Sequence, residues 1–113
     1  MIGRADEKGF RQLLPGIQQR TPVFGTQMLL AEFRLAKDAI LPLHNHPHEQ
    51  IGYLVSGRLR FTIGGEVTLV AAGDSWCVPG GVEHGVEVLD DAVVVEVFAP
   101  VREDYLPDAG QRR

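Results

Sequence analysis

The feature that most limits the fold is a two-residue alternation of apolar and polar side chains, in short segments separated by glycine and proline turns. Within residues 26–35, one face of this alternation holds Leu29, Ala31, Phe33 and Leu35. A period of two is typical of a half-buried strand. No segment of helical length shows apolar residues at the 3.6-residue period of an amphipathic helix. The chain is therefore predicted to fold as an all-β sandwich or barrel.

Turn residues mark the boundaries of the expected strands. Gly64-Gly65 is a two-residue hairpin signal, and Val67, Leu69 and Ala71 continue the alternation beyond it. Gly57 is expected to join two strands, and Asp90-Asp91 to reverse the chain. The expected strands are a short edge strand within residues 10–21 and residues 26–35, 40–43, 50–56, 58–63, 67–71, 75–78, 84–88 and 92–99.

Length and charge narrow the class of protein. The 113 residues suit one domain with one core, over residues 1–113, with a flexible N-terminus at 1–9 and a charged C-terminal tail at 101–113. A net charge of −4, with scattered basic residues, makes nucleic acid an unsuitable partner. No apolar run reaches membrane-spanning length, and no signal peptide is recognisable. With Cys77 as the single cysteine, a cytoplasmic location is expected.

All four histidines of the chain fall in two short segments. His44, His46 and His48 stand at alternate positions, and His84 follows the turn Pro79-Gly80-Gly81. Alternate residues of a strand point to one face, so His44 and His46 can present two imidazoles together. The turn before His84 could place it on a strand opposite that pair. The alternative is a set of surface or capping histidines.

Three neutral imidazoles and one oxygen ligand suit a divalent ion such as Zn, Ni, Fe, Mn or Co. Gln50 lies an even number of residues from both histidines, so it would point to the same face of the strand, and it is the expected oxygen ligand. Its alternative role is that of a hydrogen-bonding core residue. Strand parity turns Glu49 to the opposite face. His48 follows Pro47, where the strand breaks, so a place at the rim or behind the ligands is expected, with ligation as the alternative.

These residues resemble the two motifs of the cupin superfamily. His44-x-His46, Gln50 and Gly57 match the first motif, and Gly73-x5-Pro79-x-Gly81-x2-His84 matches the second as far as the histidine. Gln50 stands where the motif usually has glutamate, and Val88 where it usually has asparagine. The resemblance implies a small single-domain cupin, a double-stranded β-helix or jelly-roll barrel, that binds one divalent metal ion.

A finer resemblance is to small cupins related to the pectin-degradation protein. It is carried by residues 44–53, the hairpin at 61–66 and residues 98–106. That subgroup converts 4,5-unsaturated uronates to open-chain keto forms, with an acid, a phenylalanine and an arginine near the substrate. In this chain the resemblance assigns the acid to Glu96, the phenylalanine to Phe98 and the arginine to Arg102. The side chain of Glu96 is one methylene longer than that of the usual aspartate.

The residues themselves give separate reasons to consider these positions. Glu96 is the single charge in residues 92–99, a strand apolar enough to be covered on both faces, so its carboxylate is expected to be paired or functional. Arg102 could return over the barrel mouth and bind a carboxylate. Tyr53 and Phe98 could contact a substrate. The alternatives are an exposed edge glutamate, a tail arginine and core or interface aromatics.

Three functions follow as hypotheses. The first is a metal-dependent enzyme for a small, carboxylate-bearing, sugar-derived molecule, in which Glu96 moves a proton and Arg102 binds the carboxylate. The second is an Fe(II) dioxygenase, and the third is a ligand-binding or sensing module without catalysis. A homodimer is expected from the exposed strand edges.

Overall fold

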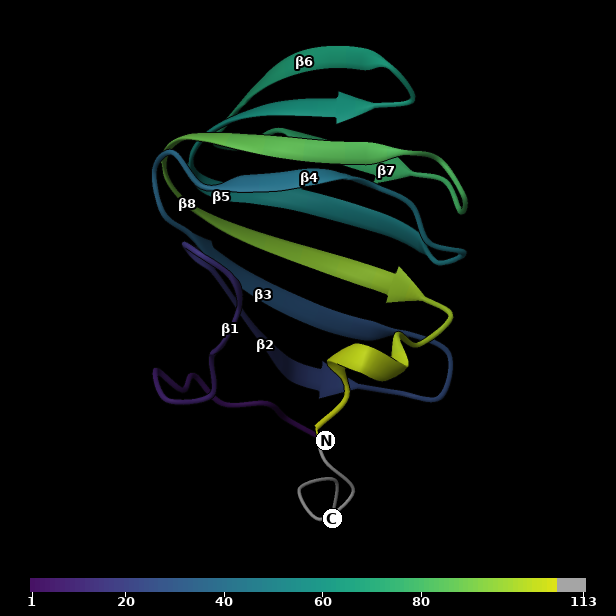
Figure 1. The fold of residues 1–113 in the computed structure, drawn as a ribbon. Helices are drawn as coiled ribbons and strands as arrows, with labels where there is room; N and C mark the ends of the chain where they lie inside the picture. The colour runs from purple at the N-terminus through teal and green to yellow at the C-terminus, as the bar shows by residue number, and fades with distance from the viewer. Residues whose placement is uncertain (108–113) are drawn as a thin grey trace.

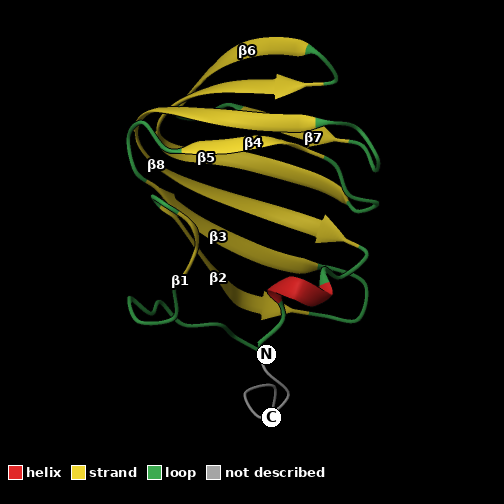
Figure 2. Ribbon diagram, in the orientation of Figure 1, coloured by secondary structure: helices red, strands yellow, loops and turns green. Residues whose placement is uncertain are grey.

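The computed structural model describes residues 1–107, which form eight strands and one 3-10 turn (Figures 1 and 2). The first four strands are β1 (Arg11–Leu14), β2 (Ile17–Phe24), β3 (Leu29–Leu35) and β4 (Ile40–His44). The other four are β5 (Glu49–Ile63), β6 (Glu66–Ala71), β7 (Ser75–Val78) and β8 (His84–Ala99). The turn η1 spans Glu103–Tyr105. The all-β prediction is confirmed.

Two long strands, β5 and β8, connect the rest of the sheet. The strand order is β1-β2-β3-β8-β5-β6, with β4 paired to β8 and β7 paired to β5, all antiparallel. The strands curl around a common interior in Figure 1. Both ends of β8 thus contribute to the wall that surrounds the histidines.

The structure differs from the expectation that Gly57 and Asp90-Asp91 divide these strands. β5 and β8 run through both positions, with register shifts between Leu54 and Leu59. Gly57 has φ +96°, and a Cβ placed on it would overlap the Asp91 carbonyl oxygen. Because residue 57 is a glycine, β5 and β8 can approach each other closely at this point. Both strands bend here and continue, whereas the sequence predicted that each would end and the chain would reverse.

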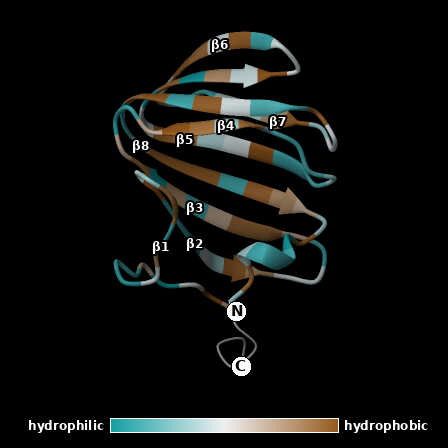
Figure 3. Cartoon of the chain, in the orientation of Figure 1, coloured by the Kyte–Doolittle hydropathy of each residue, from teal (hydrophilic) through white to brown (hydrophobic). Residues whose placement is uncertain are grey.

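The core lies on the inner faces of the strands. In β5 and β8 buried and more exposed residues alternate. Figure 3 shows hydrophobic and hydrophilic stretches along the same strands. Among the largest fully buried side chains of the core are Leu29, Leu54, Leu59, Val78 and Phe98. The alternation in β3 is as predicted, with Leu29, Ala31 and Phe33 buried. In β6 it is shifted, because Val70 is buried opposite Leu59 while Val67 and Leu69 are exposed.

The segment after β8 is more ordered than the predicted tail. Val101, Tyr105 and Leu106 pack against the core, and the Thr21 hydroxyl donates to the Tyr105 carbonyl oxygen at 2.6 Å. Residues 101–107 therefore close over one end of the barrel beside β2. The last part of the predicted tail, residues 108–113, lies outside the described residues. At the other end of the chain, Glu7 forms an ion pair with Arg34.

Candidate metal centre

Three histidines converge at the end of β4 and the start of β8. His44 and His84 are direct partners in the β4–β8 register, so their rings lie side by side with centroids 4.2 Å apart. His46, in the loop after β4, has its ring centroid 4.9 Å from that of His84. One ring nitrogen from each histidine lies within 4.8 Å of those of the other two. The predicted convergence of His84 with His44 and His46 is confirmed.

Backbone carbonyls fix the same ring nitrogen in all three histidines. The Nδ1 atoms of His44, His46 and His84 lie 2.8, 3.0 and 2.9 Å from the carbonyl oxygens of Pro42, His48 and Val82, respectively. A carbonyl only accepts, so each Nδ1 carries the proton and each Nε2 keeps its lone pair. This is the usual arrangement behind metal-binding imidazoles.

Burial in the cluster favours the neutral imidazoles of His46 and His84. His84 is 1% exposed, and burial, together with the neighbouring His44, His46 and Arg102, lowers its pKa to about 4. Burial and the positive charge of Arg102 also lower the pKa of His46. Because a metal ligand must be deprotonated, both effects favour metal binding at neutral pH.

Gln50 adds an oxygen to this cluster. Its side chain is buried at the start of β5, and its Oε1 lies 2.8 Å from His46 Nε2. With Nδ1 protonated, His46 Nε2 can only accept, and Oε1 is also an acceptor. A cation held beside them would satisfy both lone pairs. Three imidazole nitrogens and an amide oxygen therefore fit a divalent transition ion.

Glu96 lies directly behind Gln50. The Gln50 Nε2 donates to Glu96 Oε2 at 2.6 Å, and the Trp76 indole N–H donates to the same oxygen at 3.0 Å. Burial raises the pKa of Glu96 to about 7, against the opposing effects of these donors and of Arg102. Trp76 approaches because Gly52, opposite Glu96 on β5, has no side chain to block it. The expected buried and paired carboxylate is found here.

Arg102 and Phe98 lie next to the cluster. The Phe98 ring is 5.9 Å from the His46 ring, and the Arg102 guanidinium carbon is 5.0 Å from the Phe98 ring centroid. This guanidinium also lies 3.9 Å from the Tyr105 ring centroid, and it forms an ion pair with Asp104 at 2.8 Å. The two rings contact each other edge to face, with centroids 5.4 Å apart, and Arg102 packs against both. Sequence analysis did not identify Tyr105, because nothing in its local sequence indicates this contact.

Tyr53 and His48 lie outside the cluster, and for His48 this is the place that was expected. Tyr53 lies on the outer face of β5, 47% exposed, because it has the opposite parity to Gln50. The structure does not bring it to the cluster, and the expected substrate contact is corrected accordingly. His48 stands behind His46, with ring centroids 5.5 Å apart, and its buried Nδ1 has no hydrogen-bond partner among residues 1–107.

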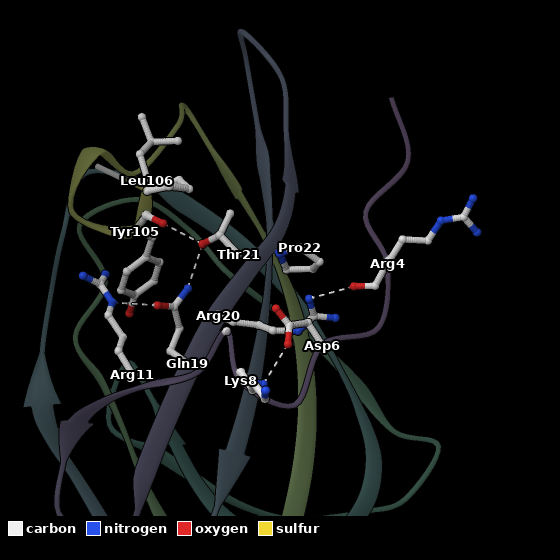
Figure 4. Close-up of a pocket in the computed structure, with 12 residues that line it drawn as sticks. Arg4, Asp6, Lys8, Arg11, Gln19, Arg20, Thr21, Pro22, Tyr105 and Leu106 are labelled. Carbon is white, nitrogen blue, oxygen red and sulfur yellow. Dashed lines mark hydrogen bonds between the residues drawn. The ribbon is translucent and has the colours of Figure 1, made fainter. Parts of the chain in front are cut away.

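One cavity lies away from the histidines. It measures about 670 Å³ and runs along the edge of β2, between the N-terminal segment and Tyr105 (Figure 4). Its lining includes Arg11, Gln19 and Thr21, which are linked by hydrogen bonds. No histidine lines it, so we assign the candidate site from the donor geometry rather than from cavity size.

Comparison with known proteins gives one family and several similar structures. The family model described as the cupin domain matches residues 31–99. A structure of KdgF from Halomonas sp. has a TM-score of 0.88 and 28% identity, over 94% of this chain and 98% of that one. An RmlC-like cupin from Shewanella frigidimarina has a TM-score of 0.88 and 25% identity, over 93% and 95%.

A sequence relative adds a partial match. An uncharacterised protein of Streptomyces coelicolor is 39% identical over 56 residues, which are 49% of this chain and 53% of that protein. The chain thus spans about half the length of that relative. Within residues 1–107, no helix has the length and apolar character needed to span a bilayer. The structural matches confirm the predicted jelly-roll architecture.

Proposed function

The chain belongs to the cupin domain family, and from that premise we propose that it is a metal-dependent enzyme acting on a small, carboxylate-bearing, sugar-derived molecule. The observation that carries the proposal is the convergence of one ring nitrogen from each of three histidines, with the Gln50 amide oxygen 2.8 Å from His46 Nε2. A divalent ion held there (Zn, Ni, Fe, Mn or Co) would supply a Lewis acid for a hydroxyl or carbonyl oxygen of the substrate.

Arg102 supplies the carboxylate specificity in this proposal. Its side chain is 14% exposed and packs against the adjoining rings of Phe98 and Tyr105. A planar guanidinium fixed in this way can form two parallel hydrogen bonds with a carboxylate. Asp104 now takes these bonds, and its side chain is 59% exposed, so a substrate carboxylate would displace it into solvent.

Glu96 supplies the proton chemistry in this proposal. Opening an unsaturated uronate ring breaks the bond between the anomeric carbon and the ring oxygen, while the anomeric hydroxyl loses a proton and an alkene carbon gains one. Substrate and product are isomers, so no other reactant is needed. A carboxyl with a pKa of about 7 can hold or release that proton near neutral pH. Gln50 links Glu96 to the cluster.

Two similarities support the uronate as substrate class. The motifs around His44 and Phe98 resemble the pectin-degradation-protein subgroup, and the structure of KdgF from Halomonas sp. covers nearly the whole chain. The residue positions that this resemblance assigns to acid, aromatic and arginine lie around one cluster here. Fold similarity alone does not determine a reaction, so the proposal depends on these side chains.

The decisive experiment is an assay for loss of the alkene absorbance of a 4,5-unsaturated uronate. We expect turnover by the metal-loaded protein, a loss of at least about 100-fold in His84→Ala, and unchanged activity in Arg60→Ala, whose side chain lies on the outer surface. Absence of turnover with every metal tested would contradict the proposal. Oxygen consumption with bound iron would then favour the dioxygenase, and tight binding without reaction the sensing module.

A further inference from the structure

The cavity along the edge of β2 has a positively charged lining, although the chain as a whole has a net charge of −4. No residue of the histidine cluster lines it, so it takes no part in the proposed reaction. A concave surface that carries one sign of charge concentrates ions of the opposite sign. Its charged residues are four cations and one acid: Arg4, Lys8, Arg11, Arg20 and Asp6.

Lys8 and Arg11 carry positive charges that the described part of the chain does not neutralise. Neither forms an ion pair within residues 1–107, whereas the Arg20 guanidinium pairs with Glu32 at 2.8 Å. The Lys8 side chain is exposed, and no hydrogen bond occupies its ammonium among these residues. Two uncompensated positive charges in one cavity favour a ligand with two negative charges.

The other charged residues of the lining indicate where an anionic group would lie. The Arg4 side chain extends away from the other labelled residues in Figure 4, so we leave it out of the site. The Asp6 carboxylate accepts the Lys8 backbone N–H at 2.8 Å and is a negative charge on that side of the cavity. An anionic group is therefore better placed on Arg11, with Lys8 adding attraction at longer range.

Arg11 is held in place by a buried amide. Gln19 is 1% exposed, and its Oε1 accepts from Arg11 Nε at 3.1 Å while its Nε2 donates to Thr21 Oγ1 at 2.8 Å. Arg11 Nη2 also donates to the Asp104 carbonyl oxygen. These contacts use two of the five N–H donors of the guanidinium, so three have no partner within residues 1–107. A guanidinium positioned in advance loses little side-chain entropy when it binds an anion.

The remaining walls suit the carbon part of a small molecule. Pro22, Tyr105 and Leu106 line the cavity, and the Arg11 guanidinium carbon lies 5.9 Å from the Tyr105 ring centroid. The volume of about 670 Å³ falls within the range of cavities that bind small organic ligands. An inorganic ion alone would fill only a small part of this space.

We propose that this cavity binds a small organic phosphate, with the phosphate group on Arg11 and the carbon part against Tyr105 and Leu106. A guanidinium donates two parallel hydrogen bonds to phosphate oxygens, and a phosphate dianion matches the combined charge of Arg11 and Lys8. A carboxylate carries one negative charge and neutralises only half of it. This binding site is separate from the metal centre and does not depend on the proposed reaction.

The test is isothermal titration calorimetry of the full chain with three sugars that share one ring. Glucose 6-phosphate should bind with a dissociation constant of about 1 mM or lower, and glucuronate and glucose at least about tenfold more weakly. The affinity for glucose 6-phosphate should not change when a chelator removes bound metal. No binding, equal binding of glucose or glucuronate, or loss of binding with the chelator would each overturn the proposal.

Two pairs of variants locate the bound phosphate. Arg11→Gln should raise the dissociation constant at least about tenfold, and Arg60→Gln, on the outer surface, should leave it unchanged. Lys8→Gln should raise it about threefold, because a distant charge is lost, and its matched control is the exposed Lys37→Gln outside the cavity. The Lys8 side chain makes no contact that folding needs. An unchanged affinity in Arg11→Gln or Lys8→Gln, or an equal loss in the control of either, would overturn the proposal.

Discussion

The Gln50 amide nitrogen donates to the Glu96 carboxylate at 2.6 Å, while the amide oxygen of the same side chain faces His46. This contact gives a physical reason for an amide where the cupin motif usually has glutamate. A glutamate at this position would bring two buried carboxylates together, with no donor between them. Gln50 avoids that repulsion and still offers an oxygen to the cluster.

The first prediction exchanges these two groups. Gln50→Glu should lower the free energy of unfolding of the metal-free protein by about 3 kcal/mol at about pH 8, because a buried charge loses its donor. The double variant Gln50→Glu, Glu96→Gln restores one donor and one acceptor and should recover at least half of that loss. Urea unfolding in the presence of a chelator measures both. Additive losses in the double variant would contradict the role of the contact.

The second prediction concerns pH. The pKa of Glu96 is about 7 in the folded protein against 4.5 for an ordinary glutamate, so the folded state holds more protons between these values. The free energy of unfolding must therefore fall as pH rises through this range. Compared with Glu96→Gln, the metal-free native chain should lose up to about 3 kcal/mol between about pH 4.5 and 7. A constant difference between the two proteins would refute the burial of an ionisable carboxyl.

The third prediction tests the metal ligands. His84→Ala should lose most of the bound metal, because it removes one of three convergent imidazoles. His48→Ala is the matched control, since it keeps the backbone carbonyl that bonds His46 Nδ1. Elemental analysis of the proteins as purified gives the stoichiometry. Equal metal content in His84→Ala and the native chain would show that the cluster is not the metal site.

The fourth prediction concerns the proposed carboxylate site. Arg102→Ala should raise KM for an acidic substrate about tenfold or more and leave metal content unchanged. Asp104→Asn should lower KM, because it removes the anion that now occupies the guanidinium. Steady-state kinetics with the uronate and binding of a neutral analogue separate these effects. If Arg102→Ala weakens binding of the neutral analogue as much as binding of the acidic substrate, Arg102 does not select for the negative charge.

The fifth prediction compares two glycines with nearly the same φ. Gly57 has φ +96° and Gly73 has φ +95°, but an added Cβ meets Ala92 Cα at 2.7 Å at the first and no atom within 4 Å at the second. Gly73→Ala should cost about 1–2 kcal/mol from backbone strain. Gly57→Ala should cost several kcal/mol, because β5 and β8 must also separate. Similar losses in thermal unfolding would show that the bend tolerates a side chain.

Sequence analysis predicted the parts of the site that depend on local pattern. The apolar–polar alternation and the turn residues predicted an all-β fold. The positions of His44, His46 and His84 in two short motifs predicted that their side chains converge, as they do. Glu96 was identified because one charge in an apolar strand needs a partner. The sequence alone could also have excluded Tyr53 from the site, because it lies an odd number of residues from Gln50 and therefore points to the opposite face of β5.

The remaining contacts depend on strand register between distant segments. No local signal places Trp76 beside Glu96, or Tyr105 under Arg102, since each pair meets only after the barrel closes. The continuity of β5 and β8 was missed for a related reason. Gly57 resembles a turn residue in isolation, whereas here it permits close approach of the Asp91 backbone.

The position of β8 has a consequence for the order in which the molecule forms. This strand pairs with β3, β4 and β5, and it begins with His84. Most of these pairings join residues far apart in sequence, so the entropy of loop closure must be overcome before they form. We therefore expect slow folding, in milliseconds to seconds, with affinity for metal emerging in the same kinetic phase as the compact state rather than before it.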